Sequence, residues 1–142
     1  MFPFHICLHA RPQDVAAGET VELDGRTSAT LAVEPASLVS PMSVSFEEAA
    51  ESLARLPRMF VEPDGSFVWV GESAEPKWQI DGCLYDRAGS LLYVELKGSC
   101  PPAEFDLLLR AFGWPASSLI VQLVRQAVFV EEQAFRRLLE TA

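Results

Sequence analysis

The sequence predicts a single α+β domain with a mixed central β-sheet and flanking helices. The chain has 142 residues, which is the usual size of one domain with one hydrophobic core. Hydrophobic residues make up 49% of it and charged residues 22%, as is typical of a folded globular protein. Strand-like runs are followed by segments with helical spacing, and this order favours a sheet with helices packed on one or both faces.

The N-terminal part of the chain has no helical periodicity and is rich in turn-forming residues. Two short strand-like runs, residues 4–8 and 30–33, are separated by turn formers that include Gly18 and Asp24-Gly25. We therefore expect residues 1–43 to form an extended β-rich arm that precedes an α/β core over residues 44–142. The edge of such an arm presents unpaired backbone groups, so the arrangement is compatible with a homodimer that pairs through a strand edge.

Three helices are predicted in the core from apolar residues at helical spacing. The first begins with a capping box, in which Ser45 and Glu48 can bond reciprocally, and it ends before Pro57. The second lies between Pro101-Pro102 and Gly113. The third covers residues 131–140.

Five strands are predicted around the second of these helices. Residues 59–62 and 67–70 flank a Pro-Asp-Gly turn and form one hairpin. Residues 77–86 and 90–97 form a second hairpin, and residues 119–124 are an apolar, β-branched run typical of an inner strand. From residue 45 onward the predicted order is therefore helix, four strands, helix, strand, helix.

The second hairpin brings two carboxylates together. A three-residue loop closed by a left-handed Gly89 sets a register in which Asp81 faces Glu95, with Lys97 two residues further along the same face. The β-carbons of opposed residues lie about 5 Å apart, where like charges destabilise a sheet unless a cation neutralises them. Lys97 supplies one positive charge, and a divalent ion such as Mg²⁺, which prefers oxygen ligands, could supply two more.

These residues resemble a known catalytic motif. Asp81, followed by Glu95-Leu96-Lys97 on the adjacent strand, after a capped helix and before a helix and a strand, resembles the PD-(D/E)xK nuclease superfamily. The match in element order covers residues 45–125 and implies an α-β-β-β-α-β type core. It further implies that Asp81 and Glu95 bind Mg²⁺ and that Lys97 is the catalytic lysine of a divalent-metal-dependent phosphodiesterase, or of an inactive relative of one.

Two alternatives compete with this hypothesis. The same three residues can form a solvated hairpin face on which Lys97 offsets Asp81 and Glu95. The whole chain can instead be a non-enzymatic, small acidic protein-binding domain, an adaptor or chaperone, since its length, acidity and α+β order are similar to those of bacterial secretion chaperones. An enzyme needs the carboxylate face open and concave, whereas an adaptor can leave it flat or covered.

Charge and cysteine content restrict the partners and the compartment. Twenty Asp and Glu against eleven Lys and Arg give a net charge of −9, which repels phosphate backbones and disfavours nucleic acid as a partner. No apolar run approaches the ~20 residues of a membrane span, and the first residues lack the basic start of a secretory signal. The three cysteines show no CxxC spacing. We therefore expect a cytoplasmic protein without a membrane segment, disulfide framework or Cys-based zinc site.

Overall fold

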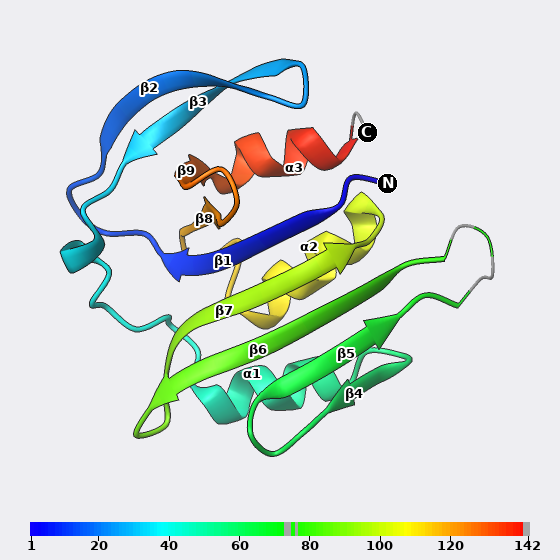
Figure 1. The fold of residues 1–142 in the computed structure, drawn as a ribbon. Coiled ribbons are helices and arrows are strands. Elements are labelled where there is room, and N and C mark those ends of the chain that lie inside the picture. The colour runs from blue at the N-terminus through cyan, green and yellow to red at the C-terminus, as the bar shows by residue number, and fades with distance from the viewer. Residues whose placement is uncertain (73–74, 76, 141–142) are drawn as a thin grey trace.

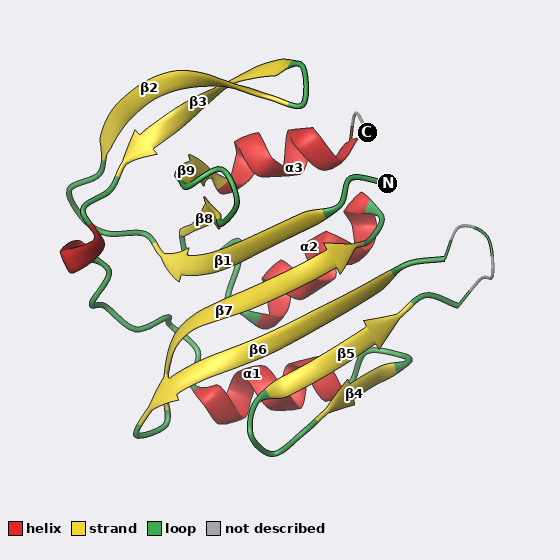
Figure 2. Ribbon diagram, in the orientation of Figure 1, coloured by secondary structure: helices red, strands yellow, loops and turns green. Residues whose placement is uncertain are grey.

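The computed structural model describes residues 1–72, 75 and 77–140, and in them a nine-stranded sheet carries three α-helices on one face (Figures 1 and 2). The strands are β1 (Phe4–Ala10), β2 (Ala16–Leu23), β3 (Arg26–Ala32), β4 (Met59–Val61), β5 (Ser66–Val70), β6 (Gln79–Arg87), β7 (Ser90–Ser99), β8 (Leu119–Leu123) and β9 (Val128–Glu131). The helices are α1 (Phe46–Ala54), α2 (Pro102–Ala111) and α3 (Glu132–Glu140), with a short 3₁₀ turn at Pro35–Ser37. The α+β class is confirmed.

The strand directions differ from the prediction of a mixed sheet. The spatial order is β2-β3-β9-β8-β1-β7-β6-β5-β4, and the paired strands all run antiparallel. β7 and β8 are joined through α2 and do run in the same direction, because each is antiparallel to β1. Since β1 lies between them, no parallel pair forms.

β1 occupies the centre of the sheet, so the expectation of an N-terminal arm beside the core was wrong. Its residues pair with β7 on one side and with β8 on the other, and Figure 1 shows it between these strands. Phe4, Ile6 and Leu8 are buried against the helices, and the alternate residues point to the opposite face. β1 therefore contributes to the same hydrophobic core as the later strands and helices.

β2 and β9 were not predicted as strands. β2 is an edge strand with most of its residues exposed, and its pairing with β3 is interrupted after Ala17. Apolar alternation, the usual signal of a strand, is therefore weak in it. β9 has only four residues and runs directly into α3. The turn predicted at Asp24-Gly25 joins β2 to β3, with φ of 52° and 77° at its two residues.

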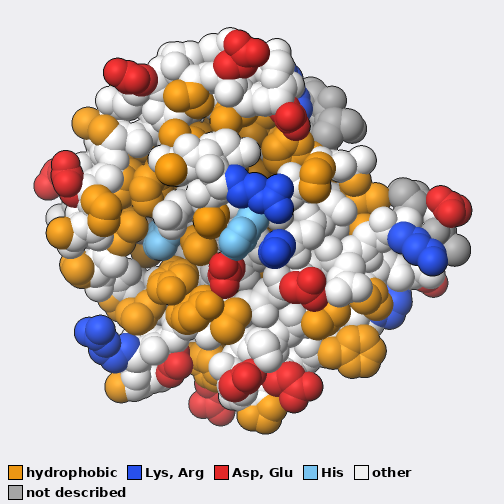
Figure 3. Space-filling model, viewed as in Figure 1, with side chains coloured by type: hydrophobic (Ala, Val, Ile, Leu, Met, Phe, Trp, Pro, Cys, Tyr) orange, Lys and Arg blue, Asp and Glu red, His pale blue; other side chains and the backbone are white. Residues whose placement is uncertain are grey.

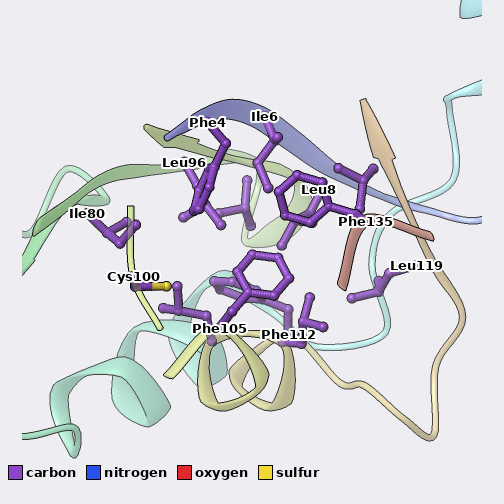
Figure 4. Close-up of a cluster of buried hydrophobic side chains, with 14 of the residues drawn as sticks. Phe4, Ile6, Leu8, Ile80, Leu96, Cys100, Phe105, Phe112, Leu119 and Phe135 are labelled. Atoms are coloured by element: carbon purple, nitrogen blue, oxygen red, sulfur yellow. The ribbon is translucent and has the colours of Figure 1, made fainter. Parts of the chain in front are cut away.

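The core lies between the sheet and the helices (Figure 4). Phe4 of β1 packs edge-on against Phe105 of α2 and Phe135 of α3, with ring centroids 5.8 and 5.4 Å apart. Edge-to-face aromatic contacts of this kind add to the burial of apolar area. The three rings therefore join the first strand, the second helix and the last helix in one packed unit.

The three helices occur where the apolar spacing predicts them. Ser45 accepts a hydrogen bond from the backbone N–H of Glu48, at 3.0 Å, and the Glu48 side chain accepts one from the N–H of Ser45, at 2.9 Å. This confirms the predicted capping box. No helix among the described residues is both long and apolar enough to cross a membrane.

Gly82 of β6 allows a large aromatic side chain to pack directly on the strand. Phe67, opposite it on β5, is almost fully buried. A β-carbon at Gly82 would lie 2.1 Å from Cζ of the Phe67 ring, which is far inside van der Waals contact. The absence of a side chain at Gly82 is therefore part of the packing of β5 against β6.

Gly82→Ala is expected to destabilise the protein by about 2–3 kcal/mol, because the new methyl group overpacks the core. In a Gly82→Ala/Phe67→Leu double variant the ring that causes the clash is gone, so the loss should be smaller than the sum of the two single losses. Urea unfolding of the four proteins measures this. Strictly additive losses would show that the two residues do not share this contact.

Candidate functional site

The turn of the β6–β7 hairpin differs from the predicted three-residue loop. It is a two-residue turn at Ala88 and Gly89, which have φ of 50° and 88°. Left-handed conformation at both central residues is typical of the tight turns that match strand twist. The sequence suggested a single left-handed residue, Gly89, because alanine seldom adopts positive φ. A bulge then leaves Leu92 without a partner on β6.

These two changes shift the register by two residues. Asp81 lies opposite Lys97, and Glu95 lies opposite Cys83, so the prediction that Asp81 faces Glu95 directly was wrong. Beyond the bulge, from Tyr93 onward, the shift of two keeps each side chain on its predicted face, since the period of a strand is two; before it Leu91 is buried in the core instead of lying on the polar face. Asp81, Glu95 and Lys97 therefore do share a face. The two carboxylates belong to diagonal neighbours, which in a sheet are roughly 7–8 Å apart, with their β-carbons somewhat closer.

Nine side chains form a regular polar and aromatic array on this face, across the adjacent strands β1, β7 and β6. Figure 3 shows the face, with histidine, acidic, basic and hydrophobic side chains intermixed. The pairing of the strands gives three rows: His5, Lys97 and Asp81; Cys7, Glu95 and Cys83; His9, Tyr93 and Tyr85. We call these nine residues the sheet-face array. Glu95 stands at its centre.

Both oxygens of the Glu95 carboxylate are hydrogen-bonded within the array. His5 Nε2 donates to Oε2 at 2.7 Å, and the Tyr85 hydroxyl donates to Oε1 at 3.0 Å. The His5 hydrogen bond lowers the pKa of Glu95 most, against the opposing effect of burial, and the Tyr85 hydrogen bond and the charge of Lys97 lower it further. The same bond to Glu95 raises the pKa of Tyr85. Glu95 is therefore held as a carboxylate by side chains of its own chain.

Hydrogen bonds within the chain compete with a two-carboxylate magnesium site. Mg²⁺ binds carboxylate oxygens, but both oxygens of Glu95 already accept hydrogen bonds, and Oδ1 of Asp81 accepts one from Gln79 Nε2 at 2.9 Å. Within the described ranges, no three His, Cys, Asp or Glu side chains are grouped so as to hold a metal ion. The hollow at this place, bordered by His5 and Lys97 among others, has a volume of about 260 Å³.

The two cysteines of the array are not placed for nucleophilic or redox chemistry. Burial and the nearby charge of Glu95 raise the pKa of Cys7 to about 11, and burial is also the main cause that raises the pKa of Cys83. Both thiols are therefore protonated at neutral pH, the less reactive form. Since β7 separates their strands, their backbones lie about 9.5 Å apart, which is too far for a disulfide.

The third row of the array is a line of stacked rings. Tyr93 stacks on Tyr85 at a centroid distance of 4.5 Å and on His9 at 5.5 Å. His9 Nε2 also shares a hydrogen bond of 2.9 Å with Oε1 of Gln122, and burial lowers the pKa of this histidine. Each ring in this row stacks on a neighbouring ring, so fewer ring faces are free to stack on a ligand. The row therefore fits a structural role in the sheet better than a ligand-binding role.

A second surface feature was not predicted from the sequence. An open groove of about 960 Å³ runs between α1, the end of β4 and the β6–β7 turn, and we call it the α1 groove. It is lined by Ser45, Phe46, Glu47, Ala50, Glu51, Ala54, Val61, Glu62, Pro63, Ala88, Gly89 and Ser90. Its lining is apolar apart from the three glutamates and two serines. A sequence signal for it was present in α1, where small residues stand beside glutamates at helical spacing, but the opposing wall comes from two distant turns.

Comparison with protein-family models, with curated proteins and with solved structures gave no match.

The pKa of Glu95 depends mainly on His5 rather than on Lys97, and this ranking can be tested. His5→Phe should raise the pKa of Glu95 towards its ordinary value, while Lys97→Gln should raise it less, because the hydrogen bond outweighs the more exposed charge. A carboxyl-detected NMR titration of the three proteins measures the pKa directly. A larger shift in the Lys97 variant would contradict the assignment.

The same depressed pKa predicts the sign of a pH effect on stability. A carboxyl with a lower pKa in the folded state stabilises the fold above its unfolded-state pKa of about 4.3, and this stabilisation is lost as the pH falls through the folded-state value. His5→Phe should therefore flatten the acid limb of the stability curve. Urea unfolding between pH 3 and 7 reports this limb, and an unchanged slope in the variant would count against the role of His5.

Millimolar Mg²⁺ or Mn²⁺ is expected to leave the thermal midpoint of the wild type unchanged, because a metal stabilises only a native state that binds it. Asp81→Asn and Glu95→Gln serve as the comparison and should be equally insensitive. If metal raises the thermal midpoint of the wild type but not that of either variant, the two carboxylates do form a metal site.

Proposed function

We propose that this chain is a non-enzymatic, acidic protein-binding domain and that the α1 groove is its binding site. The observation that carries the proposal is the contrast between the two surfaces. In the sheet-face array the central carboxylate is bonded by its own neighbours. In the α1 groove a largely apolar lining is open to solvent in the part of the chain that the structure describes.

The form of the groove suits a segment of another protein. Its volume of about 960 Å³ is at the upper end of the 300–1,000 Å³ usual for small-molecule pockets. Unlike such pockets it does not enclose its occupant, because Glu47, Glu51 and Ala54 on one wall and Glu62 and Ala88 on the other are exposed. An open apolar surface of this kind is what side chains on one face of a peptide segment bury when they dock.

The phosphodiesterase hypothesis stays a prediction, and the geometry supports it less. Metal-assisted hydrolysis needs carboxylates that are free to bind the metal and a lysine directed at the attacked phosphate. Here Lys97 lies directly opposite Asp81 and is exposed, and Glu95 is bonded to His5 and Tyr85. The net charge of −9 also opposes the approach of a phosphodiester.

Indole, a small apolar probe, tests the proposal in ¹⁵N-labelled protein. We expect its chemical-shift changes to concentrate on residues of the α1 groove. Ala54→Trp should abolish them, because a helical side chain leans towards the N-terminus and would cover the turn of Ala50. Ala103→Trp, at an exposed position of α2 outside the groove, is the matched control and should leave them unchanged.

The enzymatic alternative is tested on the same preparations with bis(p-nitrophenyl) phosphate and Mn²⁺. No hydrolysis above the buffer rate is expected. Metal-dependent hydrolysis that Glu95→Gln removes would overturn the proposal. So would indole shifts scattered over the surface and equally sensitive to both tryptophan variants.

A further inference from the structure

We infer that the occupant of the α1 groove is a positively charged, amphipathic helix of a partner protein. The inference rests on the proposed function and specifies the partner. It follows from the charge around the groove, from the shape of its helical wall and from the state of the backbone groups along its other wall.

The charge around the groove is of one sign. Glu47, Glu51 and Glu62 line it, and no Lys, Arg or His is among the described residues that do. None of the three forms a salt bridge with another described residue. The basic residues nearest in sequence, Arg55 and Arg87, lie outside the lining. An apolar surface bordered by unpaired carboxylates is complementary to a segment that carries both apolar and basic side chains.

The helical wall suits another helix. Glu47, Ala50 or Glu51, and Ala54 follow each other at the i, i+3 or i+4, i+7 spacing that places residues on one face of a helix. Two of these positions carry only a methyl group, so a second helix can approach α1 closely at the alanines. The carboxylates of Glu47 and Glu51 then stand one turn apart beside this contact. Lysines spaced one turn apart on a docked helix would lie within reach of both.

Much of the opposite wall is poorly suited to an added β-strand. The N–H of Glu62 donates to Ser66 O at 2.8 Å, and its carbonyl accepts from Gly65 N–H at 3.0 Å. Pro63 has no N–H, and the carbonyl of Gly89 accepts from Phe46 N–H at 3.0 Å. Strand addition depends on free backbone donors and acceptors, and both backbone groups of Glu62 and the carbonyl of Gly89 are already hydrogen-bonded within the chain. A helix satisfies its own backbone and needs only side-chain contact.

Three synthetic peptides of about 16 residues, long enough for four turns, test the inference. The first has leucine on one face and lysine on the other. The second replaces every lysine with glutamate, and the third keeps the lysine composition but has proline at two central positions, which breaks the helix. Binding to the full chain is followed by fluorescence anisotropy of labelled peptide at low and at moderate salt.

Two protein variants with the same change of charge accompany the wild type. One carries Glu47→Gln, Glu51→Gln and Glu62→Gln in the groove. The other carries Glu19→Gln, Glu22→Gln and Glu34→Gln, which are exposed positions outside the groove. Because both raise the net charge by three, any difference between them reports charge at the groove rather than the charge of the whole molecule.

The lysine peptide is expected to bind the wild type and the control variant equally, and the groove variant about tenfold more weakly, the effect of losing three exposed charge pairs. The glutamate and proline peptides should bind at least about tenfold more weakly than the lysine peptide. Added salt should reduce the difference in affinity between the lysine and glutamate peptides, since it screens exposed charges.

Equal loss in the two variants, or equal binding of lysine and glutamate peptides, would overturn the inferred charge of the partner. Equal binding of the proline peptide would overturn its helical form. Either result leaves the proposed function standing if indole still maps to the groove. If the lysine peptide fails to bind while indole maps to the groove, the inference alone is wrong; if indole does not map there, the proposed function fails as well.

Discussion

The placement of β1 between β7 and β8 is the constraint on which the rest of the structure depends. One face of β1 supplies Phe4, Ile6 and Leu8 to the core, and the other supplies His5, Cys7 and His9 to the sheet-face array. Without this strand β7 and β8 would not share a sheet, and α2, which connects them, would lose the Phe4 ring against which Phe105 packs. The first residues of the chain therefore join two hairpin-built halves that fold from separate stretches of sequence.

The same strand determines the chemistry of the sheet face. A carboxylate at the centre of a sheet needs a neutralising partner, and the hairpin alone offers only Lys97. The structure provides a hydrogen-bond donor from β1 instead, because His5 reaches Glu95 diagonally across the pair of strands at 2.7 Å. The need that would otherwise favour a metal is met within the chain. The pattern formed by Asp81, Glu95 and Lys97 is therefore weaker evidence for a catalytic site.

Local features of the fold could be predicted from the sequence, and long-range ones could not. The capping box at Ser45, the apolar spacing of the helices and the turn signals depend on neighbours in sequence. They predicted all three helices and the β4–β5 and β6–β7 hairpins, but not the β8–β9 hairpin. The two-residue period of a strand correctly predicted that Asp81, Glu95 and Lys97 lie on one face of the sheet. The predicted register of this hairpin was wrong because neither the positive φ of Ala88 nor the bulge at Leu92 is indicated by the type of residue at that position. The strands that pair with β1 could not be predicted, because the contacts are distant in sequence: 90 residues separate His5 from Glu95.

The glutamates of the α1 groove can be compared with what helix stability alone would select. Glu47 lies in the first turn of α1, where a negative charge interacts favourably with the helix dipole. That reason does not extend to Glu51, which lies past the first turn, or to Glu62, which follows β4 on the other side of the groove. These two carboxylates line the same apolar surface without a basic partner among the described residues, so neither the helix dipole nor an ion pair within the described residues accounts for their position. The inferred cationic occupant would account for it, since it would neutralise carboxylates from both walls at once.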